Sequence, residues 1–363
     1  MRADETARSA HPEGIRCMLL RGGTSKGAFF LASDVPADPE ERDDLMLRLL
    51  GSPDPRQIDG LGGGHPLTSK AAIVSVSEDR DADLDYLFLQ VGVDRATVGA
   101  AQTCGNLLAA VGPFAVERGL LPAGGDGMTT ARIRLRNTGG AATATFATRA
   151  GAPDYDGDAA IDGVPGTAGA IELRLGAGAG PVLPTGLAAQ EIVGRRVTLV
   201  DNGMPVVLVD AASLGVSGDE DPGALEADAR LCAAVEEIRR EAGPLFGLGD
   251  VREQTVPKVV LLSPPRHGGT ISTRAFIPFR VHASIGVLMA ASVAAGIRIP
   301  GAVGHDLARL PAGPEHEIEH PAGVLRTRVD VSRGDDGAWR ASSRSMRTAR
   351  KIFDGIVFPR PRR

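Results

Sequence analysis

The sequence predicts an α+β protein made of two similar β-rich lobes, each folded around one buried helix. Three observations support this prediction. The 363 residues are too many for one ordinary core and enough for two. Short apolar segments punctuated by glycine dominate the chain, and few stretches have a helical period. Beyond residue 186 the motifs of the first half recur in the same order.

Composition and charge exclude several classes of protein. The net charge is −5, so there is no basic surplus for binding nucleic acid. No apolar run reaches the ~20 residues that span a bilayer. Residues 1–14 lack the apolar core of a signal peptide, and we expect them to form a disordered tail. Three widely spaced cysteines argue against a disulfide framework and favour a reducing, cytoplasmic location.

Secondary structure can be predicted for most of the first half. Residues 39–50 predict a helix with early acidic residues and an apolar stripe. Residues 106–118 predict a buried helix, apolar nearly all round, that Gly119 ends. Residues 150–180 are expected to form loops around edge strands, and residues 176–186 are the best candidate for a linker. The expected strands cover residues 15–20, 28–31, 71–76, 84–93, 131–136 and 142–148.

Three matched segments indicate a tandem duplication. The segment RGGTSKGAFFLASD, which starts at Arg21, matches DNGMPVVLVDAASL, which starts at Asp201. The segment CGNLLAAV at Cys104 matches SIGVLMAA at Ser284 with the same separation of 180 positions. A looser match pairs SKAAIV with PKVVLL and needs a small insertion. Three matches in one order predict two lobes of the same design.

The starts of the two buried helices predict an anion-binding cleft. Each helix opens with a turn of small residues, TCGN in one half and ASIG in the other. Backbone N–H groups at a helix start are free to bind anions. If the lobes face each other, the starts at Gly105-Asn106 and Ile285-Gly286 converge on a doubly or triply negative small molecule. Fixed dipoles of this kind also stabilise an enolate that forms beside a carboxylate.

The segment RGGTSKG is a glycine turn rather than a phosphate loop. It lacks the spacing G-x-x-x-x-G-K-[ST], and the strand AFFL follows it instead of a helix, which excludes nucleotide binding. The turn can present the hydroxyls of Thr24 and Ser25 to a carboxylate. The alternative is an ordinary hairpin turn.

Two residues stand out as acid–base candidates. Lys70 follows Thr68 and Ser69 at the entry of an apolar segment, and a partly desolvated lysine can act as a base near neutrality. Cys104 opens the buried helix, where a thiol loses its proton more easily. The alternatives are an exposed surface lysine and a small buried apolar cysteine. The histidines share no metal-ligand spacing, so no metal site is expected.

Long motifs carry a family resemblance from about Ile15 to the end of the chain. MLLRGGTSKGAFF, SPDPRQIDGLGG, LTSKAAIV, QTCGN with VGPFAVERGL, DNGMPVVLV and RTARKIFDG resemble the 2-methylaconitate cis-trans isomerase (PrpF) family. VLPTG, LGVSG, TRAFIP, VHASIGV and EHPAG look closest to its 4-oxalomesaconate tautomerase branch. The resemblance implies a diaminopimelate epimerase-like fold, with two pseudo-symmetric β-barrel-like lobes each around a central helix.

The resemblance also implies the layout of the domains and the site. The closing strand is expected to return to the first lobe, which gives domains of residues 15–185 plus 346–360 and of residues 186–345. Lys70 would be the principal acid–base group and Cys104 its partner, without metal or organic cofactor. The expected substrate-binding residues are Thr24, Ser25, Thr68, Ser69, Gly105, Asn106, Asn202, Met204, Arg274, Ser284, Ile285 and Gly286.

Three stretches depart from the family pattern, and all of them flank the catalytic pair. They are Gly64-His65-Pro66, Gly99-Ala100-Ala101 and Thr103, where the family commonly has a small polar run, an Asp-Tyr-Gly-like run and Asn. The departures bear on the identity of the substrate more than on the type of reaction.

The function predicted from these residues is an isomerase. It would catalyse keto–enol tautomerisation or a 1,3-allylic proton shift in a small unsaturated tricarboxylate such as 4-oxalomesaconate. The alternatives are cis–trans isomerisation of an aconitate-type acid, amino-acid epimerisation, and polycarboxylate binding without catalysis. Because Ser284 matches Cys104 in the repeat, the chain lacks the two symmetric thiols of a two-base epimerase. The expected partner is the polycarboxylate substrate, without nucleic acid or membrane, and a homodimer is an open option.

Overall fold

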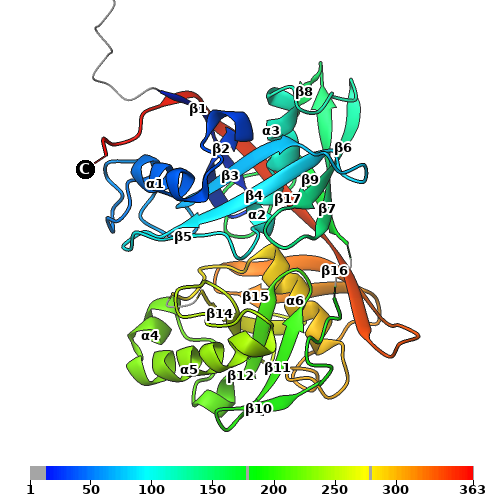
Figure 1. The fold of residues 1–363 in the computed structure, drawn as a ribbon. Helices are drawn as coiled ribbons and strands as arrows, with labels where there is room; N and C mark the ends of the chain where they lie inside the picture. Colours follow the sequence, from blue (N-terminus) through cyan, green and yellow to red (C-terminus); the bar gives the residue numbers. More distant parts are fainter. Residues whose placement is uncertain (1–13, 177–179, 278–279, 363) are drawn as a thin grey trace, which may run out of the picture.

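The computed structural model describes residues 14–176, 180–277 and 280–362, which form two lobes, one above the other in Figure 1. Residues 1–13 of the expected tail, and residues 177–179 of the expected linker, lie outside the described residues. No helix in the described ranges is long and apolar enough to cross a membrane.

The first lobe contains nine strands and three α-helices among the described residues. The strands are β1 (Ile15–Gly22), β2 (Ser25–Leu31), β3 (Lys70–Val76), β4 (Leu84–Val91), β5 (Val98–Gly99), β6 (Gly127–Leu135), β7 (Ala141–Arg149), β8 (Ala152–Pro153) and β9 (Ala170–Leu175). The helices are α1 (Pro39–Leu50), α2 (Gly105–Leu108) and α3 (Val111–Glu117). The six strands expected from the sequence are present, with ends that differ by a few residues.

The second lobe repeats this plan. Its strands are β10 (Gln190–Ile192), β11 (Arg195–Asp201), β12 (Pro205–Asp210), β13 (Lys258–Ser263), β14 (Ile271–Phe276), β15 (Glu315–His320) and β16 (Gly323–Arg333). Its helices are α4 (Pro222–Ala227), α5 (Ala229–Leu245) and α6 (Val287–Ile297). The last strand, β17 (Trp339–Val357), belongs to both lobes.

Strand pairing confirms the duplication. In the first lobe β1–β2 is antiparallel, β2–β3 parallel, β3–β4 antiparallel, β4–β6 parallel and β6–β7 antiparallel. In the second lobe the pairs from β11–β12 to β15–β16 alternate in the same way. Strand β3 therefore corresponds to β13, and the helices between β4 and β6 correspond to α6.

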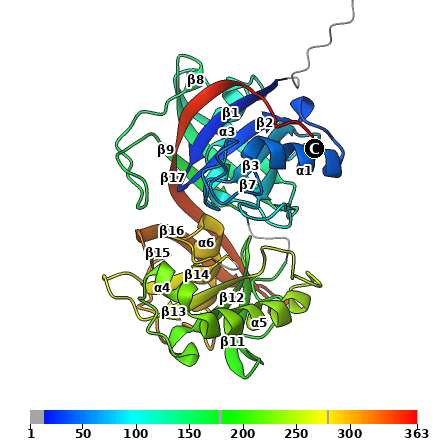
Figure 2. The ribbon, with the colours of Figure 1, turned by 90° about the vertical axis from the view of Figure 1, so that its left-hand side faces the viewer.

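Each lobe has an outer and an inner layer of helix. Helix α1 packs on the outside of the strands of the first lobe, and α4 and α5 pack on the outside of those of the second (Figure 2). Asp38 caps the start of α1 through its carboxylate, and Gly51 ends the helix with φ 82°. The inner helices α2, α3 and α6 share one large apolar core that extends through both lobes. Since that core is continuous, the two lobes pack against each other at the inner helices.

The inner helix of the first lobe differs from the expected one. Instead of a single helix over residues 106–118, the chain forms α2 and α3 with a break at Ala109 and Ala110. Pro113 explains the break, because it has no N–H to donate to the carbonyl of Ala109 four residues earlier. The first lobe therefore has only one helical turn beside the lobe boundary, whereas α6 runs for 11 residues.

Strand β17 connects the lobes through hydrogen bonds on both. Residues 339–344 pair with β16, residues 343–348 with β9, and residues 349–357 with β1. The expected return of the closing strand to the first lobe is thus present in the pairing. The residue bounds of the two domains remain a prediction.

Candidate active site

Lys70 lies at the boundary of the lobes as the first residue of β3. The apolar residues that follow it form a central strand buried between β2 and β4, and this places the lysine inside the protein. Its side chain is buried, with Nζ 5.1 Å from the centre of the Phe88 ring. Burial lowers the pKa of Lys70 from its usual value, and nearby Cys104 opposes this shift. A lowered pKa raises the proportion of neutral amine at a given pH, which makes Lys70 more suitable as a base.

Gln90 holds the Lys70 ammonium from the neighbouring strand. The two residues face each other in the β3–β4 pair, and Lys70 Nζ donates to Gln90 Oε1 at 2.5 Å. The amide nitrogen of Gln90 donates to the carbonyls of Pro66 and Ser69, which keeps its oxygen directed at the lysine. The ion pairs of the described residues include none with Lys70.

Cys104 precedes α2 and lies half-buried beside Lys70. It is the N-cap residue of the helix, without a side-chain cap bond, and its carbonyl accepts a hydrogen bond from the hydroxyl of Tyr86. Lys70 and Cys104 line the same cavity. The structure therefore brings together the two residues that the sequence singled out.

The starts of the two inner helices touch at Gly105 and Val287. A Cβ atom on Gly105 would lie 2.9 Å from Cβ of Val287 and 3.2 Å from Cγ of Leu288, so only glycine permits this approach. The glycine turn before β2 packs on the same helix start, since a Cβ on Gly22 would lie 2.5 Å from the carbonyl oxygen of Asn106. These close contacts fix the relative positions of the turn and of both helix starts.

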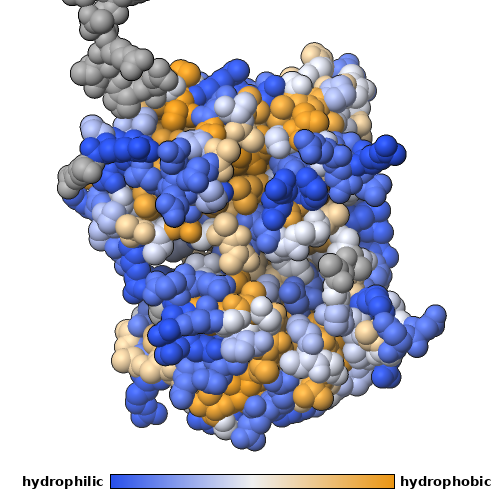
Figure 3. Space-filling model, in the orientation of Figure 1, coloured by the Kyte–Doolittle hydropathy of each residue, from blue (hydrophilic) through white to orange (hydrophobic). Residues whose placement is uncertain are grey.

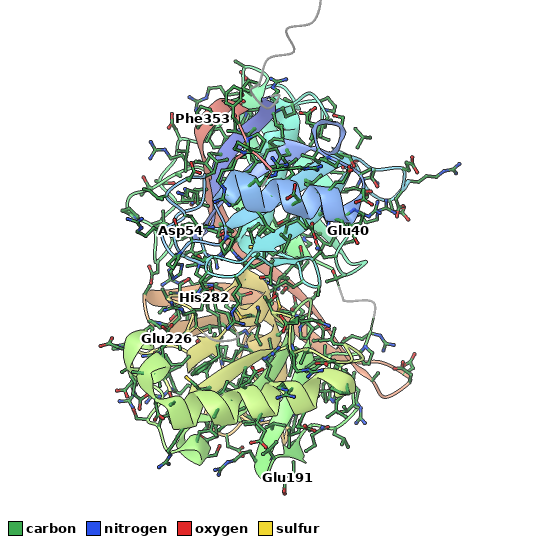
Figure 4. All side chains as sticks on the ribbon, turned by 60° about the vertical axis from the view of Figure 1, so that its left-hand side comes forward. Glu40, Asp54, Glu191, Glu226, His282 and Phe353 are labelled. Carbon is green, nitrogen blue, oxygen red and sulfur yellow. The ribbon has the colours of Figure 1, made fainter. Side chains whose placement is uncertain are left out.

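One cavity of about 400 Å³ lies at this junction. The space-filling view shows the surface hollowed between the lobes on its left side (Figure 3). In Figure 4, His282 lies where the lobes meet and Glu226 lies on the adjoining edge of the second lobe. From the first lobe the lining includes Ser25, His65, Lys70, Phe88, Gln90, Gln102, Thr103, Cys104, Gly105 and Asn106. From the second lobe it includes Met204, Lys258, Arg280, His282 and the first turn of α6 from Gly286 to Met289.

Four polar atoms of this lining lack a hydrogen-bond partner. They are the hydroxyl oxygens of Ser25 and Thr103 and the carbonyl oxygens of the Gln102 and Asn106 side chains. All four side chains are buried. An unsatisfied buried group costs roughly 1–3 kcal/mol, so such groups gather where a ligand or water completes them. Thr103 is one of the departures from the family pattern, and it faces this cavity.

Several expected substrate ligands lie outside the cavity lining. Ser69 donates to the carbonyl of Val91, and Thr68 donates to the carbonyl of His65. Arg274 is directed at the carbonyls of Glu220 and Thr273. Their side chains support the surrounding loops in this structure, and a role in substrate binding remains a prediction.

Four further expected ligands also lie outside the cavity lining. Asn202 binds Ser292 and Ala291 of α6, and Ile285 belongs to the apolar core. Ser284 donates to Thr24 at 3.3 Å across the lobe boundary, and Thr24 accepts a second bond from Asn106. Thr24 and Ser284 thus tie the lobes together.

The equivalence of Ser284 with Cys104 needs correction. The structure gives α6 the N-cap residue Gly286, so Gly286 is the position that corresponds to Cys104 by helix start. The displacement arises because two more residues precede the helix in the second half. No thiol stands opposite Cys104 in either alignment, since the two candidate positions hold serine and glycine.

Sequence reasoning missed two lining residues from the second lobe. His282 is buried, and burial together with the charge of Lys70 lowers its pKa to about 3, so its ring is neutral. Lys258 is buried against the same cavity. The match of PKVVLL to SKAAIV already aligned Lys258 with Lys70, so the sequence did indicate that the two lysines are counterparts in the repeat. Within the described residues, no group of three or more His, Cys, Asp and Glu side chains is placed to hold a metal ion.

The fold belongs to a known class. A solved hydroxyproline epimerase from Agrobacterium vitis superposes with a TM-score of 0.60 at 14% identity, covering 95% of this chain and 92% of that one. This likeness confirms the α+β epimerase-like fold. By its fold, this is a two-lobed α+β protein with the epimerase-like architecture.

The match over the whole sequence is more specific. The family model "PrpF protein" matches residues 13–360, and the chain belongs to the PrpF family. It is 50% identical to a (4E)-oxalomesaconate Δ-isomerase of a Novosphingobium species, over 97% of this chain and 99% of the relative. It is 49% identical to a 4-oxalomesaconate tautomerase of Pseudomonas putida, over 94% and 95% of the two chains. The chain is therefore an isomerase.

We expect Cys104 to react with iodoacetamide faster than Cys17. Cys17 is fully buried, and burial raises its pKa to about 12, whereas Cys104 opens onto the cavity. Peptide mass spectrometry after limited alkylation measures both rates. Propane-1,2,3-tricarboxylate (tricarballylate) should slow alkylation of Cys104 and leave Cys232, which lies outside the cavity lining, unaffected. A Cys104 that reacts only in denaturant would instead be a core residue.

Proposed function

We propose that this chain isomerises a small unsaturated tricarboxylate of the 4-oxalomesaconate type by acid–base catalysis at Lys70 and Cys104, without a cofactor. The observation that carries the proposal is the buried Lys70 amine, which lies beside Cys104 and the uncapped start of α6 in a cavity at the lobe boundary. Two relatives with about half of their residues identical, a (4E)-oxalomesaconate Δ-isomerase and a 4-oxalomesaconate tautomerase, support the substrate class.

The proposed reaction is a proton transfer within one molecule. The neutral Lys70 amine takes a proton from a carbon that lies between a carboxylate or carbonyl and an alkene. The C–H electron pair moves into the conjugated system and gives a dienolate. The Lys70 ammonium then protonates a different atom of that system, so the substrate and product have the same composition and the amine is restored. If the Cys104 thiol donates instead, the ammonium passes its proton to the thiolate, which restores both groups.

The second lobe supplies stabilisation of the negative charge. Gly286 provides no side-chain cap, and the residues from Gly286 to Met289 line the cavity. The free N–H groups of this first turn can bind a carboxylate or the developing dienolate. Burial in a low-dielectric site strengthens these interactions over those in water.

Incubation with 4-oxalomesaconate in deuterated water tests the proposal. We expect solvent deuterium to enter the carbon that loses or gains the proton, detected by NMR. Exchange confined to the α-carbon of an amino acid would indicate an epimerase. Saturable binding of polycarboxylates without exchange would indicate a binding protein. Either result would reject the proposed function.

Substitutions separate the roles of the two residues in the same assay. Lys70→Ala should lower turnover by about a hundred- to ten-thousand-fold, the usual contribution of a general base. Cys104→Ser should keep more activity, because one base can move a proton across a single face. Lys351→Ala is the control, since Lys351 is partly exposed and pairs with Glu117 away from the cavity. Near-normal turnover in folded Lys70→Ala would exclude Lys70 as the base.

The pH dependence of turnover should report on Gln90. Its carbonyl oxygen accepts from the charged form of Lys70 and so favours the ammonium. Gln90→Leu removes this acceptor and should lower the pKa of Lys70 further. The acid limb of the pH profile of kcat/KM, where protonation of the base stops turnover, should then shift to lower pH. An acid limb that stays at the same pH, or moves to higher pH, would contradict its assignment to Lys70.

Prolonged chelation followed by desalting should leave activity unchanged, because the proposed steps use only protein side chains. The measurement compares kcat and KM before and after treatment. Recovery of lost activity on adding zinc, iron or a nucleotide would overturn the cofactor-free mechanism.

A further inference from the structure

Lys258 occupies the same place in the second lobe as Lys70 in the first. Each is the first residue of its strand, β13 or β3. Each strand pairs in parallel with the preceding long strand and antiparallel with the following one. The duplication therefore places one lysine on each side of the lobe boundary.

The Lys258 side chain is buried against the cavity without a carboxylate partner. It is 4% exposed, and its ammonium donates to the carbonyl of Thr255. The ion pairs of the described residues include none with Lys258. An ammonium carries three protons, so one backbone acceptor leaves most of its capacity unused.

The surroundings of Lys258 contain donors and positive charge. Lys70 and Arg239 both act to lower the pKa of Lys258, after burial itself, while Cys104 opposes them. Arg239 is already bound to Glu236, and the acid Glu226 on the cavity lining is paired with Arg280. Two buried lysines therefore share one cavity without a counter-charge from an ion pair.

The start of α6 completes the subsite. The first-turn residues from Gly286 to Met289 line the same cavity as Lys258. Gly286 leaves their N–H groups without a side-chain cap. The Lys258 amine and the free N–H groups of the α6 start are donors that line one cavity, and a carboxylate can accept from both.

We propose that Lys258 binds a carboxylate of the substrate from the second lobe, opposite Lys70. This deepens the proposed function and rests on it for the substrate class. The site then selects acids whose carboxylates project toward both lobes. A tricarboxylate supplies a negative group for Lys258 and the α6 start and still leaves a conjugated carbon facing Lys70.

Binding of inert acids measures this role without turnover. Titration calorimetry compares tricarballylate with glutarate, which lacks the third carboxylate. We expect Lys258→Met to lower the affinity for tricarballylate about ten- to a hundredfold, which is the usual contribution of a hydrogen bond to a charged group. The affinity for glutarate should fall by a smaller factor, so the ratio of the tricarballylate affinity to the glutarate affinity decreases. Lys258→Arg should restore part of this ratio because it keeps the positive charge.

Lys351→Met is the matched control, since it removes the same charge from a partly exposed site outside the cavity. It should leave both affinities within about fivefold of the parent. An unchanged affinity ratio in Lys258→Met, in a protein with the parent melting curve, overturns the proposal. So does lost turnover with parent-like tricarballylate binding, which would place Lys258 in proton transfer, and so does absence of tricarballylate binding by the parent.

The two proposals fail separately in these measurements. If the parent binds tricarballylate through Lys258 and does not turn over 4-oxalomesaconate, the carboxylate subsite stands and the proposed substrate is wrong. If turnover is normal and the affinity ratio does not depend on Lys258, the proposed function stands and the subsite is wrong.

Discussion

The contact between Gly105 and Val287 is the constraint on which the rest of the site depends. It joins the first residues of two inner helices, one from each half of the duplicated chain. A larger residue at Gly105 would separate these helix starts, because the space for a Cβ is already filled by Val287. The cavity, the Lys70 amine and the Cys104 thiol all lie at this junction. Close approach of the lobes therefore creates one shared site out of two half-sites.

Several polar groups of this site lack ion-pair or hydrogen-bond partners. The surrounding apolar core offsets the free energy that this costs. Two lysines without ion-pair partners and four oxygen atoms without hydrogen bonds meet in one cavity. A buried polar group without a partner costs free energy, so these oxygen atoms favour a ligand or water that completes them. The apolar core around the inner helices, which extends through both lobes, holds the arrangement in place. In the proposed arrangement a substrate carboxylate binds Lys258, while a conjugated carbon of the same molecule faces Lys70.

The sequence predicted most of the fold because it shows both the apolar pattern of the individual elements and the similarity of its two halves. Strand segments and the helix of residues 39–50 follow local rules of burial and capping, and three matched segments revealed the two lobes. The break before Pro113 was missed because an uninterrupted apolar pattern predicts one continuous helix. The proline in the sequence, which has no N–H to donate, could have indicated the break. Ser284 was aligned with Cys104 because small residues match easily, and only the helix start identifies Gly286. Lys258 appeared in the weakest match, and its burial is a property of the packed lobes that no local pattern shows.

The duplication gives the two halves different shares in the proposed chemistry. Both halves retain a lysine at the start of the same strand, so an amine lines the cavity from each lobe. Only the first half retains a thiol at its helix start, because Gly286 stands at the other. A two-base epimerase needs a reacting group on each face of one carbon, which this arrangement of thiols does not provide. A shift of a proton along one face of a conjugated acid needs a base on one side and anion ligands on the other. The loss of symmetry at the helix starts, with symmetry kept at the lysines, is the physical reason to favour an isomerase of unsaturated acids over an epimerase on this shared fold.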